Sequence, residues 1–402
     1  MHRRILCGAL TLGVLLSAHS RTVHAYEVTD DLDIYGYFQA WLTVYEQMQD
    51  AQGLFQDITN DPAADFTSGF RMARLRLGLD YTFLGGKLGV ALLLKLEGDP
   101  GMLDVNARWM PFKWLTIQIG QMRIPSTAEN LRADRDLGFV LRTELSDALA
   151  DFSLSRTNYP SSLMHGNRSF RRDFGLGVKA HCEGRLFAAR AFLMMGNGLG
   201  ANLFISGDSA RGFLITNKAQ FFWAGRVELE PWREHIVIGG HFSYNRHDNV
   251  VFESGRTVLD IDRLSGSGDL ELRFARLGLR LGGLGGYGEI NEDFNVDGRT
   301  DFRYWGGSGY LLWDLAPMLR WLTRGRFAPH HHIVLGFRYE RYASNWDEAA
   351  LWTHLTTYTV GATYRYGSTV KLQLNAVLRR TDKPFYPDLD DDLYVLSVQF
   401  AL

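Results

Sequence analysis

The chain has 402 residues, with 43 Lys and Arg against 45 Asp and Glu. This near balance of charge argues against a general nucleic-acid-binding protein, which needs a basic surface. The 42 glycines and many aromatic residues, with only ten prolines, favour an all-β chain over a helical one. The length suits two or three soluble domains or one large barrel.

Residues 1–25 have the features of a secretory signal peptide. His2-Arg3-Arg4 gives a charged start, residues 5–18 are apolar, and Val23-His24-Ala25 offers a cleavage site before Tyr26. The apolar run is too short for a membrane span, and charged residues interrupt every later apolar stretch. We therefore expect an exported chain, with residues 26–402 as one domain. Cys182 would then be the only cysteine, which excludes an intramolecular disulfide.

Apolar and polar residues alternate with a period of two along most of the chain, as in half-buried strands. The clearest example is residues 73–83, where Ala, Leu, Tyr and Phe alternate with Arg, Gly, Asp and Thr. In chain order the pattern predicts sixteen strands, at residues 32–45, 73–83, 88–96, 105–109, 115–122, 173–180, 186–195, 220–229, 236–244, 268–274, 277–287, 302–313, 333–342, 356–366, 370–379 and 393–402.

This alternation suits either a soluble sandwich or a membrane barrel, because each has one apolar face. Three features favour the barrel. Many strands have about ten residues, aromatic residues lie near strand ends, and short and long connections alternate. The exception is the long connection at 314–331, on the side of the short turns. We predict a transmembrane antiparallel β-barrel, with short turns facing the periplasm and long loops facing outward.

The longest segment without alternation is 123–172. A structureless loop of this length inside a domain is uncommon and often functional. We predict that it folds into the lumen and narrows the pore. Its arginines outnumber its carboxylates, and the planar guanidinium suits phosphate or carboxylate oxygens. The constriction residues we predict are Arg123, Arg132, Arg135 and Arg142. Alternatively, these arginines form salt bridges that hold the loop against the wall.

Basic residues also recur on the parity that would face the lumen. A row of cations inside a low-dielectric wall raises the local anion concentration. Alternatively, each cation pairs with a carboxylate on a neighbouring strand and braces the wall. The pore-lining residues we predict are Arg74, Arg76, Lys95, Arg108, Lys179, Arg190 and Arg226, and the same parity holds Arg280, Arg338, Arg365, Lys371 and Arg379.

Six short motifs occur in order along the chain: Phe70-Arg71-Met72-Ala73-Arg74-Leu75, Ile119-Gly120-Gln121-Met122-Arg123-Ile124-Pro125, Arg135-Asp136-Leu137-Gly138-Phe139, Arg172-Asp173-Phe174-Gly175-Leu176-Gly177, Ala224-Gly225-Arg226-Val227-Glu228 and Tyr358-Thr359-Val360-Gly361-Ala362. By their order and spacing, the chain resembles the phosphate-selective porin O and P family of Gram-negative outer membranes. The resemblance implies a sixteen-stranded, trimeric, anion-preferring pore with a basic constriction loop.

Other motifs give weaker signals. Residues 283–288 have the GxGxxG spacing of a dinucleotide site, but no helix follows, so close strand packing explains them better. Residues 293–298 match half of a calcium loop, whose twelfth position is Tyr304 where Glu is required. His330-His331-His332 suits a solvated turn better than a metal site. No motif of a hydrolase, metalloprotease or thiol enzyme is present, so we predict a non-enzymatic protein without a cofactor.

Together these features predict an outer-membrane porin, a passive channel for small hydrophilic solutes that prefers anions such as phosphate. Its expected partners are those solutes, outer-membrane lipid and two further copies in a homotrimer, without nucleic acid. The first alternative is a barrel that acts as an enzyme or surface-binding protein and whose loop plugs the pore. The second is a soluble β-sandwich or propeller, which would be extracted without detergent.

Overall fold

The computed structural model describes residues 26–29, 31–46, 69–98, 100–150, 171–198, 213–217, 221–252, 257–294, 298–345, 352–382 and 392–402. The proposed signal peptide, the second half of the 123–172 segment and the loop residues 295–297 lie outside these ranges. Within them, no helix is long and apolar enough to cross a membrane.

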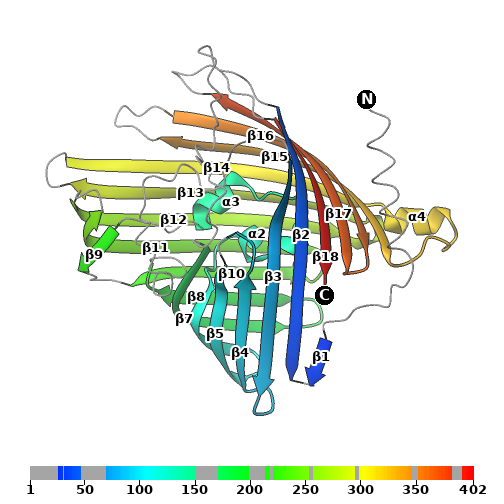
Figure 1. Cartoon of the computed structure of the whole chain (residues 1–402), viewed down its shortest axis with the longest axis horizontal. Helices are drawn as coiled ribbons and strands as arrows, with labels where there is room; N and C mark the ends of the chain where they lie inside the picture. Colours follow the sequence, from blue (N-terminus) through cyan, green and yellow to red (C-terminus); the bar gives the residue numbers. More distant parts are fainter. Residues whose placement is uncertain are drawn as a thin grey trace.

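Sixteen antiparallel strands form a closed barrel (Figure 1). Each pairs with the next along the chain, and the pairings of β8 with β10 and of β18 with β2 complete the circle. The strands are β2 (Leu32–Glu46), β3 (Gly69–Phe83), β4 (Leu88–Lys95), β5 (Gly101–Phe112), β6 (Leu115–Arg123), β7 (Arg172–Glu183), β8 (Ala188–Gly196), β10 (Phe222–Trp232), β11 (Ile236–Phe252), β12 (Thr257–Phe274), β13 (Leu279–Phe294), β14 (Gly298–Asp314), β15 (His331–Asn345), β16 (Trp352–Tyr366), β17 (Val370–Asp382) and β18 (Asp392–Ala401).

Two short strands extend this sheet. β1 (Tyr26–Thr29) pairs with the start of β2, and β9 (Phe213–Asn217) pairs with the outer end of β11. The helices are α2 (Ala128–Leu131), α3 (Glu144–Ala150) and α4 (Ala316–Leu322), with 3-10 turns η1 (Asp134–Asp136) and η4 (Ala275–Leu277). The helix α4 occupies the long connection between β14 and β15.

Side chains alternate between the lumen and the outer surface, as the period-two pattern predicts. The inward Arg74 is 2 % exposed and the inward Gln373 is 1 % exposed, whereas the outward Leu77 is 40 % exposed. A soluble sandwich would bury its apolar face, so this arrangement excludes that alternative. The predicted transmembrane barrel of about sixteen strands is confirmed.

The strands differ in height around the barrel. β4, β5, β6, β7, β8 and β10 have between 8 and 12 residues, whereas β11 to β16 have between 15 and 18. We call these the short wall and the tall wall. The strands predicted at 236–244 and 268–274 in the tall wall were too short, because β11 continues after Tyr244 and β12 begins before Gly268, and these extensions pair as a hairpin.

Candidate functional site

Residues 124–150 fold into the barrel, where α2 and α3 lie across the lumen (Figure 1). The local sequence explains this fold. The Thr127 side chain caps α2 by accepting the backbone N–H of Asn130, and the Asn130 amide donates to the Ser146 carbonyl in α3. These contacts satisfy helix ends that would otherwise be unpaired, so the segment forms a compact unit. We call residues 124–150 the lumen loop.

Side chains of β15 hold the lumen loop in place by hydrogen bonds to the backbone of the loop. Arg338 donates to the carbonyls of Leu141 at 2.9 Å and Arg142 at 3.3 Å, and the Glu340 carboxylate accepts the Leu145 N–H at 3.1 Å. Side chains of the wall thus replace the partners that water would supply to an irregular backbone.

The strand β17 continues this row of contacts. Lys371 donates to the Leu137 carbonyl at 2.7 Å, Gln373 donates to the Gly138 carbonyl at 2.6 Å, and Asn375 accepts the Val140 N–H at 2.7 Å. Three alternate residues of one strand therefore hold three residues of the loop segment 137–140, because successive inward side chains follow the strand at a two-residue spacing.

Ion pairs attach the loop at further points. Asp134 lies 2.9 Å from Arg74 of β3 and also contacts Arg142 within the loop. Arg132 lies 2.6 Å from Glu271 of β12. Charged contacts therefore hold the loop to β3 and to β12 of the tall wall.

Apolar contacts complete this attachment. Val140 and Leu141 pack with Trp41, and Phe139 packs with Leu312. In α3, Leu145 and Leu149 form a cluster with Ala148, Tyr304, Tyr342 and Leu355. Gly286 makes room for α3, because a Cβ there would lie 2.9 Å from the Leu149 side chain. The glycine run at 283–288 lies in β13, so the prediction of strand packing over a dinucleotide site is confirmed.

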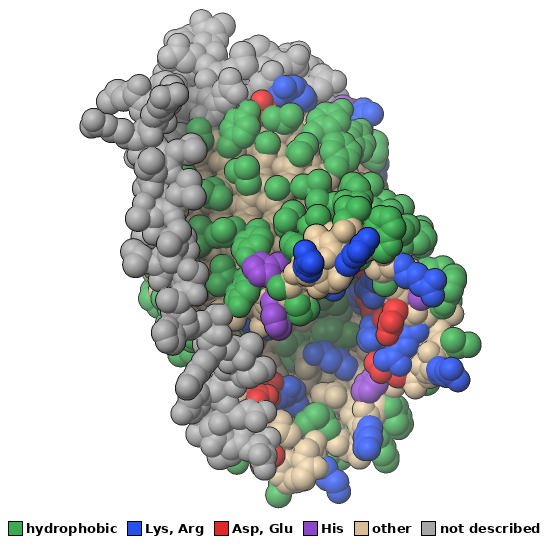
Figure 2. Space-filling model, turned by 90° about the vertical axis from the view of Figure 1, so that its right-hand side faces the viewer, with side chains coloured by type: hydrophobic (Ala, Val, Ile, Leu, Met, Phe, Trp, Pro, Cys, Tyr) green, Lys and Arg blue, Asp and Glu red, His purple; other side chains and the backbone are tan. Residues whose placement is uncertain are grey.

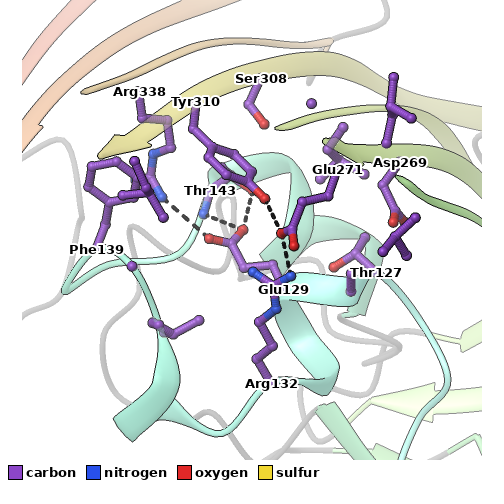
Figure 3. A pocket seen from close by; sticks show the side chains of 18 of the residues that line it. Thr127, Glu129, Arg132, Phe139, Thr143, Asp269, Glu271, Ser308, Tyr310 and Arg338 are labelled. Atoms are coloured by element: carbon purple, nitrogen blue, oxygen red, sulfur yellow. Dashed lines mark hydrogen bonds and ion pairs between the residues drawn. The ribbon is translucent and has the colours of Figure 1, made fainter. Parts of the chain in front are cut away.

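A cavity of about 300 Å³ remains between the lumen loop and β10 to β15. Figure 3 shows Arg132 directed toward Glu271, and Glu129 directed toward Arg338 and Thr143. Glu271 also accepts a hydrogen bond from Tyr310 at 2.5 Å. The charges lining this cavity are largely paired with one another.

Burial perturbs the titratable groups of the loop. Burial is the main reason that the pKa of Glu144 is raised to about 8; Arg379 at 3.6 Å opposes this rise, whereas the nearby Glu340 and Asp147 add to it. Burial lowers the pKa of Arg132, but Glu271 and Tyr310 more than reverse this effect, so the pKa lies above its ordinary value. Arg132 therefore stays charged inside the lumen.

The short wall faces the lumen loop with less firmly bound cations. Arg108 contacts Asp80 and keeps about a fifth of its side chain exposed. Lys179 lies over the Phe192 ring at 4.7 Å and, in the described part of the chain, has no carboxylate within ion-pair distance. Arg135 of the loop lies over Tyr35 at 5.9 Å. These three side chains keep solvent-accessible surface.

A second group of cations lies at the end of the barrel that carries α4. Arg273 faces Arg280 across β12 and β13, and Arg365 faces Lys371 across β16 and β17. Among the described residues, neither Arg280 nor Arg365 has a carboxylate within ion-pair distance. Figure 2 looks onto this end and shows a hollow with Lys and Arg side chains on its wall. We call these four residues the mouth cations.

The predicted pore-lining residues fall into two groups. Those held in contacts with the wall or the loop are Arg74, Arg76, Arg123, Arg142 and Arg226, and all of these except the half-buried Arg123 are buried. Those that keep solvent-accessible surface are Lys95, Arg108, Arg132, Arg135, Lys179 and Arg190. For the first group the bracing alternative describes the geometry, and for the second group the pore-lining role stays a prediction.

Several residues that hold the loop were not singled out from the sequence. They are uncharged polar residues on inward positions, such as Gln373, Asn375 and Tyr310. In the sequence, the signal for such residues is an amide or hydroxyl side chain at an inward position of an otherwise regular strand.

The weaker motifs carry no ligand site in the described residues. His332 binds Asp314 at 2.6 Å and His331 binds the Tyr364 hydroxyl at 2.8 Å. In the ranges given above, no group of three His, Cys, Asp or Glu side chains could hold a metal ion. Cys182 is exposed.

Comparisons with known proteins match the fold. The anion-selective porin from Comamonas acidovorans aligns with a TM-score of 0.58 at 12 % identity, over 92 % of this chain and 99 % of that one. The outer membrane channel DcaP of Acinetobacter baumannii aligns at 0.56 and 11 % identity, over 94 % and 100 %.

OmpT, an outer membrane protein of Vibrio cholerae, aligns at 0.56 and 11 % identity, over 93 % and 99 %. The chain has the fold of the bacterial outer-membrane porins. No family model and no curated protein sequence matches it. The resemblance to the phosphate-selective O and P family therefore stays a prediction.

Proposed function

We propose that this protein is an outer-membrane porin, a passive diffusion channel for small hydrophilic solutes. The observation that carries this proposal is a closed barrel whose outward face is apolar and whose inward face is polar. A wall of this kind keeps every strand paired in lipid and leaves a hydrated path inside. The lumen loop narrows that path, and no bound energy source is needed for flow down a gradient.

We infer further that small anions, including phosphate, are preferred. Lys179, Arg280 and Arg365 project into the lumen without a carboxylate at ion-pair distance in the described residues, and Lys371 binds only carbonyls. Such cations inside a low-dielectric wall raise the local concentration of anions. The similarity to a structure named as an anion-selective porin supports this preference.

The reversal potential in a planar bilayer under a salt gradient tests the preference. For the wild type we expect a potential of the sign that anion flow produces. In the Arg280→Gln/Arg365→Gln double variant, the potential should shift toward zero by several millivolts or more, because two lumen charges are lost. The matched control is Lys87→Gln/Arg276→Gln, which removes two exposed charges from periplasmic turns. A cation-type potential in the wild type would contradict the anion preference.

We propose that the short wall packs against further copies of the chain, as a homotrimer. β4, β6 and β8 have only 8 or 9 residues, at or below the nine to eleven that a tilted strand needs to cross a bilayer. Their outward side chains are apolar, apart from Gln121 and Arg123 at the end of β6, which donate to backbone carbonyls. A neighbouring barrel would cover this wall, whose strands are too short to match the thickness of the lipid bilayer.

An alternative function follows from how firmly the lumen loop is held. If the loop seals the lumen, the barrel would act as a surface-binding protein or an enzyme without conducting. Single-channel recording discriminates between these functions, because steady ion current supports the porin and its absence supports the alternative.

A further inference from the structure

At one side of the cavity between the lumen loop and the wall, two arginines share one carboxylate. Glu271 Oε2 lies 2.6 Å from Arg132 Nη2, and its Oε1 lies 2.6 Å from Arg273 Nε. The other carboxylates of the cavity each contact a different arginine, in the pairs Glu129 with Arg338, Asp269 with Arg226 and Glu228 with Arg190. The group around Glu271 therefore carries one uncompensated positive charge.

Both arginines at Glu271 can bind a further anion. Each guanidinium carries five N–H groups, and the contact with Glu271 uses one nitrogen of each. Arg132 and Arg273 are each 33 % exposed, whereas Glu271 is buried and also accepts a hydrogen bond from Tyr310. Because three partners fix this carboxylate, the two guanidinium groups are held in preset positions beside the cavity.

The cavity lies next to the mouth cations, because Arg273 belongs to both. Arg273 is the register partner of Arg280, so their Cα atoms lie about 5 Å apart on β12 and β13. A solute that enters from the hollow shown in Figure 2 meets these cations beside the cavity. Its anionic group would face three arginines and one carboxylate.

The opposite side of the cavity is apolar. In Figure 3, Phe139 lies across the cavity from Glu271. Val237, Leu284 and Leu312 also line the cavity, and their register partners are the inward residues Glu271, Asp269 and Arg280. They therefore occupy inward positions, where a hydrated lumen favours polar side chains. An inorganic ion such as phosphate gains nothing from this surface, whereas an apolar group does.

We propose that this cavity binds monocarboxylates that have an apolar body of about the size of benzoate. The carboxylate accepts hydrogen bonds from Arg132 and Arg273, whose planar guanidinium groups suit its two oxygens. The apolar body covers Phe139 and Leu312. The volume of about 300 Å³ is at the lower end of the range for small-molecule sites, roughly 300–1,000 Å³. The proposal rests on the proposed function, since it names a class of solute for the channel.

Block of the ion current tests the proposal with benzoate as the probe. In a planar bilayer, benzoate should interrupt the current of the full-length protein at a concentration roughly tenfold lower than acetate or inorganic phosphate, because only its ring is removed from water. Benzyl alcohol, which has the ring without the carboxylate, should not interrupt the current. Calorimetric titration of the protein in detergent with benzoate measures the affinity without any current.

Variants on the two sides of the cavity separate the two contacts. Arg273→Gln should weaken benzoate binding by roughly tenfold, because a hydrogen bond between charged groups is lost while Arg132 and Tyr310 still hold Glu271. Arg273→Lys keeps the charge without the planar geometry and should have an intermediate affinity. Val237→Thr places a hydroxyl on the apolar side and should reduce the preference for benzoate over acetate several-fold.

The matched control is Arg276→Gln, which removes the same charge from the exposed turn η4 and should bind benzoate like the wild type. Equal benzoate affinity in Arg273→Gln and the wild type would overturn the proposal, and so would equal block by acetate and benzoate. A barrel that conducts but does not bind benzoate refutes this inference alone. A barrel that binds benzoate but carries no current refutes the channel and leaves the binding site standing.

Discussion

The tall wall and the short wall use similar inward residues for different purposes. On the tall wall and on the nearby β17, Arg338, Lys371 and Asn375 are buried because the lumen loop rests on them. On the short wall, Arg108 and Arg190 keep exposed surface because the loop does not reach them. A charged side chain thus becomes a brace where the lumen loop covers it and keeps exposed surface where the loop does not.

Removing a brace should have a larger effect than removing a lining residue. Arg338→Ala deletes contacts to Glu129 and to two loop carbonyls, and should cost roughly 3 kcal/mol, since it leaves buried groups unpaired. Arg190→Ala on the short wall removes partly exposed ion pairs and should cost only about 0–1 kcal/mol. Urea unfolding in lipid vesicles measures both, and equal losses would erase the distinction between the walls.

A charge placed on the outer surface sharpens the comparison in another way. Ile119 on β6 and Val360 on β16 are matched, with exposed fractions of 56 % and 52 %. An arginine at either position should destabilise the barrel by about 2–4 kcal/mol if it meets lipid near the midplane. We expect Ile119→Arg in addition to dissociate the oligomer, because a neighbouring barrel would be excluded.

The oligomeric state of these two variants is read from native mass spectrometry and unheated gel electrophoresis. Val360→Arg should remain oligomeric. The reverse result, with Val360→Arg dissociated and Ile119→Arg intact, would place the subunit contact on the tall wall.

The smallest predicted effect is on the pH dependence of stability, through Glu144 of the lumen loop. Because the pKa of Glu144 is raised to about 8, the folded protein keeps a proton that the unfolded chain releases above about pH 4.5. Stability from this group is therefore full below that pH and falls as pH rises toward 8. In Glu144→Gln this slope should be smaller than in the wild type.

Unfolding midpoints between pH 5 and 8 check this expectation. Asp136→Asn serves as the matched control, since that carboxylate belongs to the same loop but is 62 % exposed. An unchanged slope in Glu144→Gln would show that Glu144 does not hold the proton.

The sixteen strands could be predicted because each keeps its alternation over enough residues to define two faces, as residues 73–83 do. The outer half of β12 was missed because small and polar residues such as Ser265 and Gly266 obscure the two faces there. The partner of Arg74 could not be predicted, since Asp134 comes into reach only through the path of the loop. Arg280, Arg365 and Arg338 all occupy inward positions in the sequence pattern. Only the structure shows that the lumen loop rests on Arg338 and not on the other two.

The seam between β2 and β18 has a consequence for assembly. Gln39 of β2 donates to Ser397 of β18 at 3.0 Å, and Leu402 donates its N–H to the Gly36 carbonyl at 2.9 Å. During synthesis, β2 emerges with one edge open and stays so until the last ten residues arrive. Such an edge can template pairing with other chains, so the growing polypeptide is prone to wrong pairing until β18 meets β2.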